Sequence, residues 1–557
     1  MAHTRLFSRL RRAFLLAREA SRLGIPVREH AEERAEAWRT NRRRFLETAA
    51  LAASAPLVAS LPACRSHSDD EIAIVGGGIA GLACAYRLSQ HGIGSRVYEH
   101  QGRTGGRMFS SRGAFKDGQV CEIGGELIDT GHTSIRNFAQ ELGITLDDSW
   151  ADAGGTLLRD RYRIGGVDID PATVITDFAG VAPLIDDAFN ALTDPNAGVT
   201  YDAPNGGQAL DQLSIAEWFD QNGVSGNIRR ILEIAYEAEY GLPIDASNVF
   251  NLLFLITTNP GEFHVYGDSD ERYHTHLGND TIPHALAKRL GDRVELEHTL
   301  VRISSASSGR YRLDFDTGSG TRAVIAPRVV LALPFSKLRT VEIDIDLPPA
   351  KTLAIQRLKY GNNAKLMVGF DHRVWRDFGH DGQAITDLRC PETWEASRGQ
   401  TGDSGIIVDY LSTTLADEVQ YGSPVERAMD FARDFDQVYP GVAAAFNRRA
   451  LRAHWPTTPW VLGSYSAWQA GDMTTFAGAE AQRVGNLHFA GEHTSLDSQG
   501  YMEGGAESGE AAAAEILTDL GVSTAAIAQS MTLGGFARRD FLAMLARGDR
   551  RRHRARR

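Results

Sequence analysis

The sequence predicts an α/β fold, α+β overall, in which a domain built on a parallel sheet is interrupted twice by a mixed domain with helices over a sheet. Three observations predict it. The 557 residues are 43% hydrophobic, which is enough apolar material for more than one core. A strand-like run, a glycine-rich turn and a helical pattern follow one another over residues 71–88. Strand-like segments with turn signals return near residues 295–340 and 485–510.

The stretches between these segments are helix-rich or mixed, so the changes in pattern divide the chain into seven parts. We expect an N-terminal extension over 1–70, the parallel-sheet domain over 71–149, 285–345 and 455–520, the mixed domain over 150–284 and 346–454, and a basic C-terminal tail over 521–557.

The N-terminal extension resembles an export signal. Residues 41–46 (NRRRFL) match the twin-arginine pattern, and an Ala-rich apolar stretch follows over 48–63. This predicts export by the Tat route to the periplasm or the cell envelope. Residues 61–64 (LPAC) resemble a lipobox, and lipidation of Cys64 would tether the protein to a membrane. An unlipidated signal and an ordinary amphipathic helix stay open as alternatives.

Charge is distributed unevenly along the chain. Residues 1–50 hold 12 Arg against 6 Glu, and residues 521–557 hold 9 Arg against 2 Asp, so the net charge of -12 leaves -25 on residues 51–520. An acidic body disfavours nucleic acid as a partner and attracts cationic ligands. Four cysteines without a CxxC pair or Cys/His ligand spacing argue against a disulfide scaffold and a zinc site, so no metal is expected.

The first strand-like run leads into Gly76-x-Gly78-x-x-Gly81, which opens the helical pattern. In a dinucleotide-binding turn the first glycine makes the tight turn, the second lets the backbone approach a pyrophosphate, and the third allows close packing of helix and strand. Glu99 ends the next strand-like run, 23 positions past Gly76, where an acidic residue accepts ribose hydroxyls. This constellation predicts a Rossmann-like dinucleotide-binding unit.

Four more glycine-rich motifs follow in order: 103–107 (RTGGR), 122–126 (EIGGE), 485–492 (GNLHFAGE) and 500–506 (GYMEGGA). As an ordered set they resemble the flavin-containing amine oxidases, a family that includes monoamine oxidases, polyamine oxidases, L-amino-acid oxidases and histone demethylases. The resemblance covers about 70–130, 280–375 and 450–517. It implies that the parallel-sheet domain binds FAD and that the mixed domain binds substrate.

The resemblance also implies individual cofactor contacts. It makes Val301 the adenine contact, Glu492 a ribityl-phosphate contact, and Met502 a neighbour of the pyrimidine edge of the flavin. Ser464 stands where some relatives carry the cysteine that bonds the flavin, which implies noncovalent FAD. Gln101 replaces a frequent basic residue near the ribose. The implied cofactor residues are Gly76, Gly78, Gly81, Glu99, Gly106, Arg107, Gly125, Glu126, Val301, Trp455, Gly491, Glu492 and Met502.

Three residues are implied at the reactive face. Residues 360–365 resemble the segment whose lysine, here Lys365, holds a water against flavin N5, and a lysine beside an apolar strand needs a partner if it is buried. Tyr465 and Tyr501 correspond to two aromatic residues that flank the substrate amine. The expected reaction passes hydride from the carbon bearing the amine to flavin N5. The imine then hydrolyses, and dioxygen or another acceptor takes the electrons.

Several interpretations stay open at this point. A simple amine is preferred because both placed pocket tyrosines are uncharged and the body is acidic. An L-amino-acid oxidase would need a cation for the α-carboxylate. A carotenoid- or porphyrinogen-type FAD desaturase and a noncatalytic FAD- or amine-binding envelope protein are further alternatives. The arginines that could serve an amino acid are Arg159, Arg161, Arg163, Arg229, Arg230 and Arg272.

Overall fold

The first described segment forms a βαβ unit. The computed structural model describes residues 71–195 and 197–531. Strand β1 (Ile72–Val75) runs parallel to β2 (Ser95–Tyr98), and helix α3 (Ile79–Gln90) connects them. Alternate residues of β1 enter two different cores, so the strand is buried on both faces, as parallel strands usually are. The predicted strand, turn and helix are therefore present.

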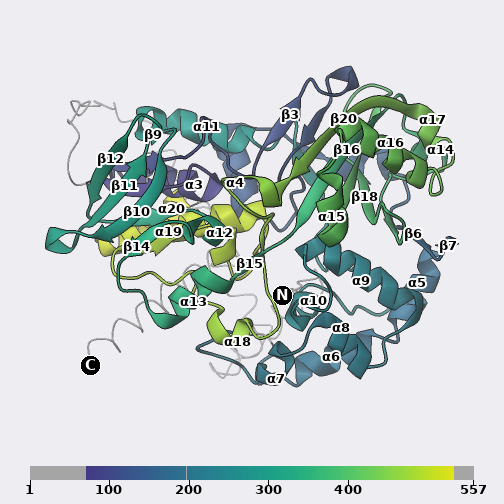
Figure 1. The fold of residues 1–557 in the computed structure, drawn as a ribbon, viewed down its shortest axis with the longest axis horizontal. Coiled ribbons are helices and arrows are strands. Elements are labelled where there is room, and N and C mark those ends of the chain that lie inside the picture. Colours follow the sequence, from purple (N-terminus) through teal and green to yellow (C-terminus); the bar gives the residue numbers. More distant parts are fainter. Residues whose placement is uncertain (1–70, 196, 532–557) are drawn as a thin grey trace, which may run out of the picture. The chain divides into compact units, whose positions relative to one another are not determined.

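A five-stranded parallel sheet is built around β1. Its order is β22-β13-β1-β2-β9, with β22 (Leu487–Phe489), β13 (Val329–Leu331) and β9 (Val294–Glu295). The strands thus come from three distant parts of the chain, because parallel neighbours require long crossover connections. Helices α3, α4 (Thr133–Leu142), α11 (Thr281–Leu290) and α19 (Met502–Asp519) pack together beside it. Figure 1 shows α3 and α19 next to each other.

A second sheet of four strands follows the order β12-β11-β10-β14. Strands β10 (Thr299–Ser305), β11 (Tyr311–Asp316) and β12 (Thr321–Ala326) are antiparallel, and β14 (Glu342–Asp344) pairs parallel to β10. These strands form the teal group of Figure 1. The strand-like segments predicted near residues 295–340 are divided between two sheets, since β9 and β13 join the parallel sheet and β10, β11 and β12 join this one.

The largest sheet has seven strands in the order β20-β16-β19-β18-β17-β6-β7. Helix α9 (Gly226–Tyr240) packs along β6, β17, β18 and β19, whereas α15 (Thr413–Val419) and α16 (Pro424–Phe435) pack on the end that contains β16. The strands are β6 (Arg161–Ile164), β7 (Val167–Ile169), β16 (Asn363–Phe370), β17 (Ala384–Thr386), β18 (Glu392–Glu395), β19 (Gly405–Ser412) and β20 (Phe446–His454).

Shorter elements complete the described chain. The remaining strands pair two by two: β3 (Ser110–Arg112) with β4 (Val120–Glu122), β5 (Leu146–Asp148) with β8 (Tyr273–Thr275), and β15 (Lys359–Tyr360) with β21 (Ser466–Ala467). The other α-helices are α5 (Pro171–Phe178), α6 (Ala182–Asn190), α7 (Gln208–Asp211), α8 (Ile215–Gln221), α10 (Val249–Leu253), α12 (Phe335–Leu338), α13 (Pro349–Arg357), α14 (Val374–Asp377), α17 (Val442–Ala445), α18 (Met473–Phe476) and α20 (Thr524–Ser530).

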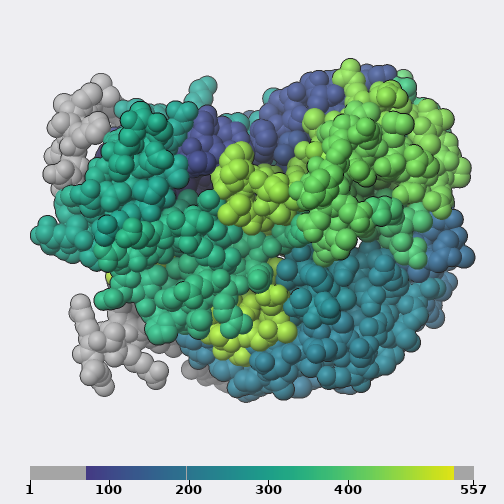
Figure 2. All heavy atoms as spheres, in the orientation of Figure 1, coloured from purple at the N-terminus to yellow at the C-terminus, as the bar shows by residue number. Residues whose placement is uncertain are grey.

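On the face shown in Figure 2, a yellow-green segment that follows β20 lies between the teal part of the chain and the green part that carries most of the seven-stranded sheet. The predicted helix-rich middle segment contains α5 to α10. The mixed α/β fold class predicted from the sequence is confirmed by this arrangement, while the predicted domain boundaries stay a prediction.

The segment predicted as a C-terminal tail begins with a helix in the structure. Residues 524–530 form α20, and Ile527 and Met531 are fully buried in the core beside α3 and α19. The apolar side chains Ile527 and Met531 explain why this stretch joins the fold instead of extending from it. The predicted Tat signal, Cys64 and residues 532–557 lie outside the described residues. Among the described helices, none is both long and apolar enough to cross a membrane.

Candidate active site

One cavity of about 480 Å³ collects most of the predicted site residues. It is lined by Lys365, Tyr465 and Tyr501 together with eleven of the thirteen predicted cofactor residues. Those eleven are Gly76, Gly78, Glu99, Gly106, Arg107, Gly125, Glu126, Trp455, Gly491, Glu492 and Met502. Residues far apart in the sequence therefore meet around one space, which is what a large bound cofactor requires.

The glycine-rich turn fits the phosphates of a dinucleotide. Gly76 has φ +112°, and a Cβ on Gly81 would lie 2.0 Å from the Gly76 carbonyl oxygen, so Gly81 allows the close packing that the motif predicts. A Cβ on Gly78 would meet nothing within 4 Å, because Gly78 borders the cavity. The first turn of α3 carries no acidic residue, so its N-terminus is free to face an anion.

Glu99 lies beside this turn with both carboxylate oxygens in use. It accepts hydrogen bonds from the backbone N–H groups of Gly77 at 2.6 Å and of Gln101 at 2.8 Å. Burial raises the pKa of Glu99, and these two hydrogen bonds oppose the increase. Glu99 thus braces the turn and still borders the cavity, where ribose hydroxyls can reach it.

Val301, the predicted adenine contact, does not line the cavity. Leu300 lines the cavity and is 7% exposed, whereas Val301 points away from it and is 41% exposed. Side chains alternate between the two faces of a strand, so a shift of one position moves a residue to the opposite face. Thr299 and Leu300 are therefore the residues of β10 that border the cavity, where an adenine could contact them.

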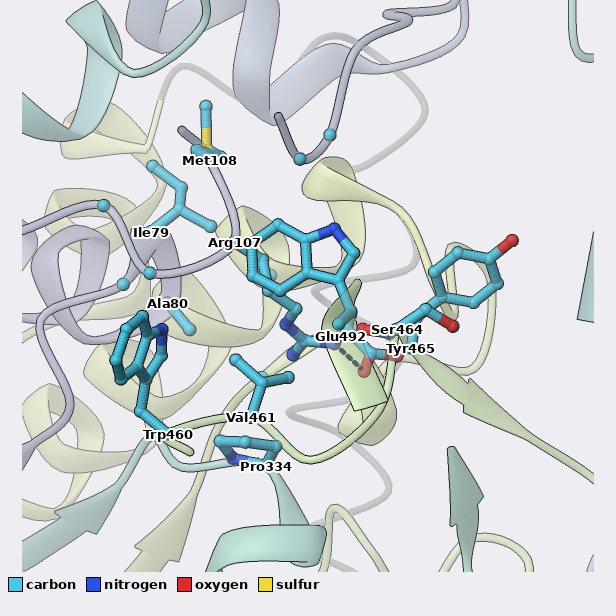
Figure 3. Close-up of a pocket in the computed structure, with 18 of the residues that line it drawn as sticks. Ile79, Ala80, Arg107, Met108, Pro334, Trp460, Val461, Ser464, Tyr465 and Glu492 are labelled. Atoms are coloured by element: carbon cyan, nitrogen blue, oxygen red, sulfur yellow. Dashed lines mark hydrogen bonds and ion pairs between the residues drawn. The ribbon is translucent and has the colours of Figure 1, made fainter. Parts of the chain in front are cut away.

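Arg107 and Glu492 form an ion pair in the cavity wall. Arg107 Nη1 lies 2.8 Å from Glu492 Oε1, as the dashed line in Figure 3 shows, and donates to the Ser464 carbonyl oxygen at 2.9 Å. Burial acts to raise the pKa of Glu492, but Arg107 and a hydrogen bond from Ser466 outweigh it and the pKa is lowered. Both side chains are thus held as an oriented, electrically neutral pair.

Lys365 has the partner that its burial requires. Its Nζ lies 2.8 Å from Glu126 Oε2 and donates to the Gly124 carbonyl oxygen at 2.8 Å. Trp394 Nε1 donates to the other carboxylate oxygen of Glu126 at 3.0 Å. The structure therefore brings together two residues for which the sequence predicted separate roles, Lys365 in catalysis and Glu126 in cofactor binding.

Tyr465 and Tyr501, the two tyrosines predicted to flank the substrate amine, lie at the same end of the cavity. Tyr501 directly precedes α19, and its hydroxyl donates to Glu239 Oε1 at 3.4 Å. The hydroxyl of Tyr465 donates to the backbone carbonyl oxygen of Glu239 and lies 3.0 Å from the hydroxyl of Tyr410. Both hydroxyl groups are thus fixed through one residue of α9, which orients the two rings relative to each other.

Three glutamates that the sequence analysis missed also line the cavity. This carboxylate cluster consists of Glu239 on α9, Glu271 in the loop before β8, and Glu392 on β18. Tyr266 donates its hydroxyl to Glu392 Oε1 at 3.0 Å. Glu271 adopts φ +46°, an uncommon conformation for a non-glycine residue, and its backbone N–H donates to Asp129 at 2.9 Å.

Burial governs the titration of this cluster. It raises the pKa of Glu271 to about 7 and that of Glu392 to about 8, with repulsion between neighbouring carboxyls adding to the effect. The pKa of Glu239 lies well above its ordinary value for the same reasons. Within the described residues, none of the three carboxyls has an ion pair with Arg, Lys or His. In the sequence, the signal for these three glutamates is the acidic net charge of residues 51–520.

None of the six arginines considered for an amino-acid substrate lines this cavity. Arg159 lines a separate cavity of about 210 Å³. Each of the six is paired with a carboxylate: Arg159 with Asp381, Arg161 and Arg163 with Asp168, Arg229 and Arg230 with Glu233, and Arg272 with Asp148.

The attachment position holds no thiol. Ser464 lines the cavity, and its hydroxyl donates to Asn363 Oδ1 at 2.6 Å. The cysteines of the described chain, Cys84, Cys121 and Cys390, are buried and none of them borders the cavity. A serine cannot form a thioether, so FAD is held here without a covalent bond. In the described ranges no group of three His, Cys, Asp or Glu side chains is placed to hold a metal ion.

Comparison with known proteins agrees with this site. The sequence profile of the flavin containing amine oxidoreductase family matches residues 79–517. An L-amino acid dehydrogenase from Synechocystis sp. is 26% identical over 463 residues, which are 80% of this chain and 94% of that protein. A probable flavin-containing monoamine oxidase A from Dictyostelium discoideum is 24% identical over 459 residues, which are 80% of this chain and 97% of that protein.

Solved structures share the fold. Wild-type putrescine oxidase bound to putrescine has a TM-score of 0.69 at 20% identity, covering 81% of this chain and 99% of its own. Cyclohexylamine oxidase from Brevibacterium oxydans IH-35A has a TM-score of 0.70 at 21% identity, covering 81% of this chain and all of its own. With a family match over most of the described residues and a cavity suited to FAD, the chain belongs to the flavin-containing amine oxidoreductases and is an FAD-dependent amine oxidoreductase.

Proposed function

We propose that this enzyme oxidises amines that carry a second cationic group and no carboxylate beside the reacting nitrogen. One observation carries the proposal: the carboxylate cluster borders the end of the cavity that also holds Tyr465 and Tyr501. Diamines and polyamines have the required chemistry. This substrate class is a narrower proposal than the simple amine expected from the sequence.

Electrostatics supports a cationic ligand at this position. A buried carboxylate without a cation is costly, and three of them close together repel one another. Within the described residues, no Arg, Lys or His lies within ion-pair distance of the cluster, and only Glu271 is influenced by cations farther away, Arg159 and Arg398. An ammonium group of the substrate would supply that partner, and it would be retained by charge-assisted hydrogen bonds. A substrate carboxylate would instead be repelled, and Arg107, the arginine among the described residues of the cavity lining, is already paired with Glu492.

The chain's residues orient the substrate, and bound FAD supplies the two-electron acceptor for C–N oxidation. Tyr465 and Tyr501 flank the reacting nitrogen, while the carboxylate cluster holds the distal ammonium. This two-point attachment fixes the carbon that gives up hydride. Lys365 would hold a water beside the bound cofactor. The imine product hydrolyses to an aldehyde or ketone, and dioxygen or another acceptor takes the electrons.

The comparisons support this proposal in part. One neighbour in fold was solved with putrescine, which is a diamine, and the relative from Dictyostelium is named as a monoamine oxidase. The relative from Synechocystis is named as an L-amino acid dehydrogenase, so amino acids belong in the test. The family match gives no support to the desaturase and noncatalytic interpretations.

Anaerobic reduction of the flavin by a substrate panel tests the proposal. We expect kcat/KM for 1,5-diaminopentane to exceed that for 1-aminopentane at least tenfold, which is about 1.4 kcal/mol. L-Lysine is 1,5-diaminopentane with a carboxylate added beside one nitrogen, so it serves as the matched amino acid and should react more slowly. A higher kcat/KM for L-lysine than for 1,5-diaminopentane would overturn the proposed substrate class.

The isosteric change Glu239→Gln separates charge from shape in this test. It removes the ionisable carboxyl beside Tyr501, which a distal ammonium group would hold in its charged form, and keeps an oxygen that can accept the Tyr501 hydroxyl. The advantage of the diamine over the monoamine should shrink severalfold, because only the diamine retains a distal charge. Equal losses for both amines would assign Glu239 a purely structural role.

Export to the periplasm or envelope is a separate proposal that rests on the sequence. The twin-arginine segment at 41–46 supports it, and the Tat route carries folded proteins with cofactor already bound. Tethering through Cys64 depends on whether the lipobox is used. Localisation of the tagged full chain tests both points.

A further inference from the structure

We propose that Glu126 and Trp394 hold the ammonium group of Lys365 in place, and that Glu126 cancels its charge at the cofactor. The inference rests on the proposed function only in placing Lys365 beside the flavin. It makes Glu126 and Trp394 positioning residues and gives Lys365 the role of an oriented hydrogen-bond donor. Neither positioning role follows from the sequence motifs.

The contacts around Lys365 leave its ammonium group little freedom. Nζ contacts Glu126 Oε2 at 2.8 Å and the Gly124 carbonyl oxygen at 2.8 Å, and it lies 3.5 Å from the Glu122 carbonyl oxygen. An ammonium group has three N–H donors. Two are thus used at short distance, and only the long contact to Glu122 is weak enough to be exchanged for a water.

Trp394 holds the carboxylate of Glu126, and that carboxylate in turn holds the ammonium group of Lys365. Its Nε1 donates to Glu126 Oε1 at 3.0 Å, and its ring lies 5.4 Å from Lys365 Nζ. Both oxygens of Glu126 therefore have a partner, one neutral and one cationic. A carboxylate held at both oxygens cannot rotate away, which fixes the direction of its bond to Lys365.

The seven-stranded sheet explains why these groups meet. Lys365 on β16 lies opposite Tyr410 on β19, which lies opposite Glu392 on β18. Trp394 is two residues beyond Glu392, so its side chain lies on the same face of the sheet. Glu126 approaches that face from the loop after β4, next to the glycine pair of the EIGGE motif. One sheet face thus presents Lys365 and Trp394 to one carboxylate.

Burial makes the charge balance matter. The side chains of Lys365 and Glu126 are 8% and 6% exposed. Arg107, another cation of the cavity wall, is already paired with Glu492. A buried charge that loses its partner remains uncompensated, because little water is available to screen it. Removing the Glu126 charge alone would therefore leave a net positive charge beside the flavin, and that charge favours the electron-rich reduced cofactor.

The reduction potential of the bound flavin tests this without any amine. We expect Glu126→Gln holoenzyme to show at least a tenfold shift of the equilibrium toward reduced flavin, about 30 mV for a two-electron couple. The double variant Glu126→Gln with Lys365→Met removes both charges. Its equilibrium constant for flavin reduction should return to within threefold of the wild-type value. Glu418→Gln is the matched control, because it removes a carboxylate from an exposed ion pair with Arg389. Its equilibrium constant for flavin reduction should stay within twofold of the wild-type value.

The double variant separates a charge effect from a packing effect. A purely structural role for Glu126 predicts that the double variant is at least as perturbed as Glu126→Gln, and that result would overturn the inference. An unchanged potential in Glu126→Gln with FAD retained would overturn it as well. If wild type is reduced by no amine, the proposed function fails, while the potentials still decide this inference.

Trp394→Phe provides a second test and carries the inference if Glu126→Gln releases FAD. This change removes the hydrogen bond to Glu126 but keeps both charges. We expect the equilibrium constant for flavin reduction to stay within twofold of the wild-type value. The rate of flavin reduction by amine should fall at least threefold. An unchanged reduction rate would show that Trp394 does not position the pair.

Discussion

The substitution Glu392→Gln measures how much the burial of one carboxyl of the cluster lowers the free energy of unfolding. Burial, together with repulsion from Glu271, raises the pKa of Glu392 from an ordinary 4.5 to about 8. The folded state therefore binds the proton more tightly than the unfolded state, and stability falls as pH rises from about 4.5 to about 8. At 1.36 kcal/mol per pKa unit, the penalty is about 3 kcal/mol at pH 7 and about 1 kcal/mol at pH 5.

Glutamine removes this penalty and keeps an oxygen for the Tyr266 hydroxyl. The substitution should therefore stabilise the protein by about 2 kcal/mol more at pH 7 than at pH 5. An unfolding entropy of about 2.1 cal/mol/K per residue amounts to about 1 kcal/mol/K for a unit of this size, so the gain in Tm should be roughly 2 °C larger at pH 7. Thermal melts of the holoenzyme followed by circular dichroism at the two pH values measure it.

Glu217→Gln is the control with the opposite sign. Glu217 is exposed and closes the capping box of α8, where hydrogen bonds from Ser214 lower the pKa of its carboxyl. Its removal should cost more stability at pH 7 than at pH 5. A Glu392→Gln gain that is equal at both pH values, or larger at pH 5, would refute the reasoning about burial.

Three further predictions concern the cofactor, the lysine and location. Acid or heat denaturation should release all the flavin colour into the supernatant because Ser464 cannot form a thioether; colour retained on the precipitate would contradict this. Lys365→Met should slow flavin reduction or reoxidation at least tenfold, about 1.4 kcal/mol, in stopped-flow traces with FAD still bound; unchanged rates would remove Lys365 from the mechanism. Arg42→Lys with Arg43→Lys should retain the protein in the cytoplasm by cell fractionation, and Cys64→Ser should alter membrane association only if the lipobox is used.

The cofactor half of the site was predictable because backbone geometry imposes it locally. Gly76 and Gly81 are required by a positive φ and by a 2.0 Å approach, so they stand at fixed spacing in the sequence. Val301, which the structure leaves outside the cavity lining, shows the limit of such reasoning. A motif locates a strand more easily than its register, and one step along a strand exchanges the buried face for the exposed one.

The substrate half could not be predicted from local pattern. The carboxylate cluster takes one residue each from a helix, a loop and a strand, and only the tertiary fold brings them together. Lys365 and Glu126 show an intermediate case, since each belongs to a motif but their pairing spans 239 positions. Periodicity and motif spacing describe neighbours along the chain, so contacts of this range leave no trace in them.

The charges of the cavity differ between its parts, and this difference is the basis of the proposed second cation. Beside the cofactor motifs, Arg107 pairs with Glu492 and Lys365 pairs with Glu126. In the part of the chain that the structure describes, no Arg, Lys or His forms an ion pair with the carboxylate cluster. A monoamine cannot supply one during reaction, because the nitrogen must be neutral for its carbon to give up hydride. A diamine can, because its distal nitrogen stays protonated throughout. The uncompensated cluster is therefore suited to a substrate with two nitrogens, of which one reacts and the other remains charged.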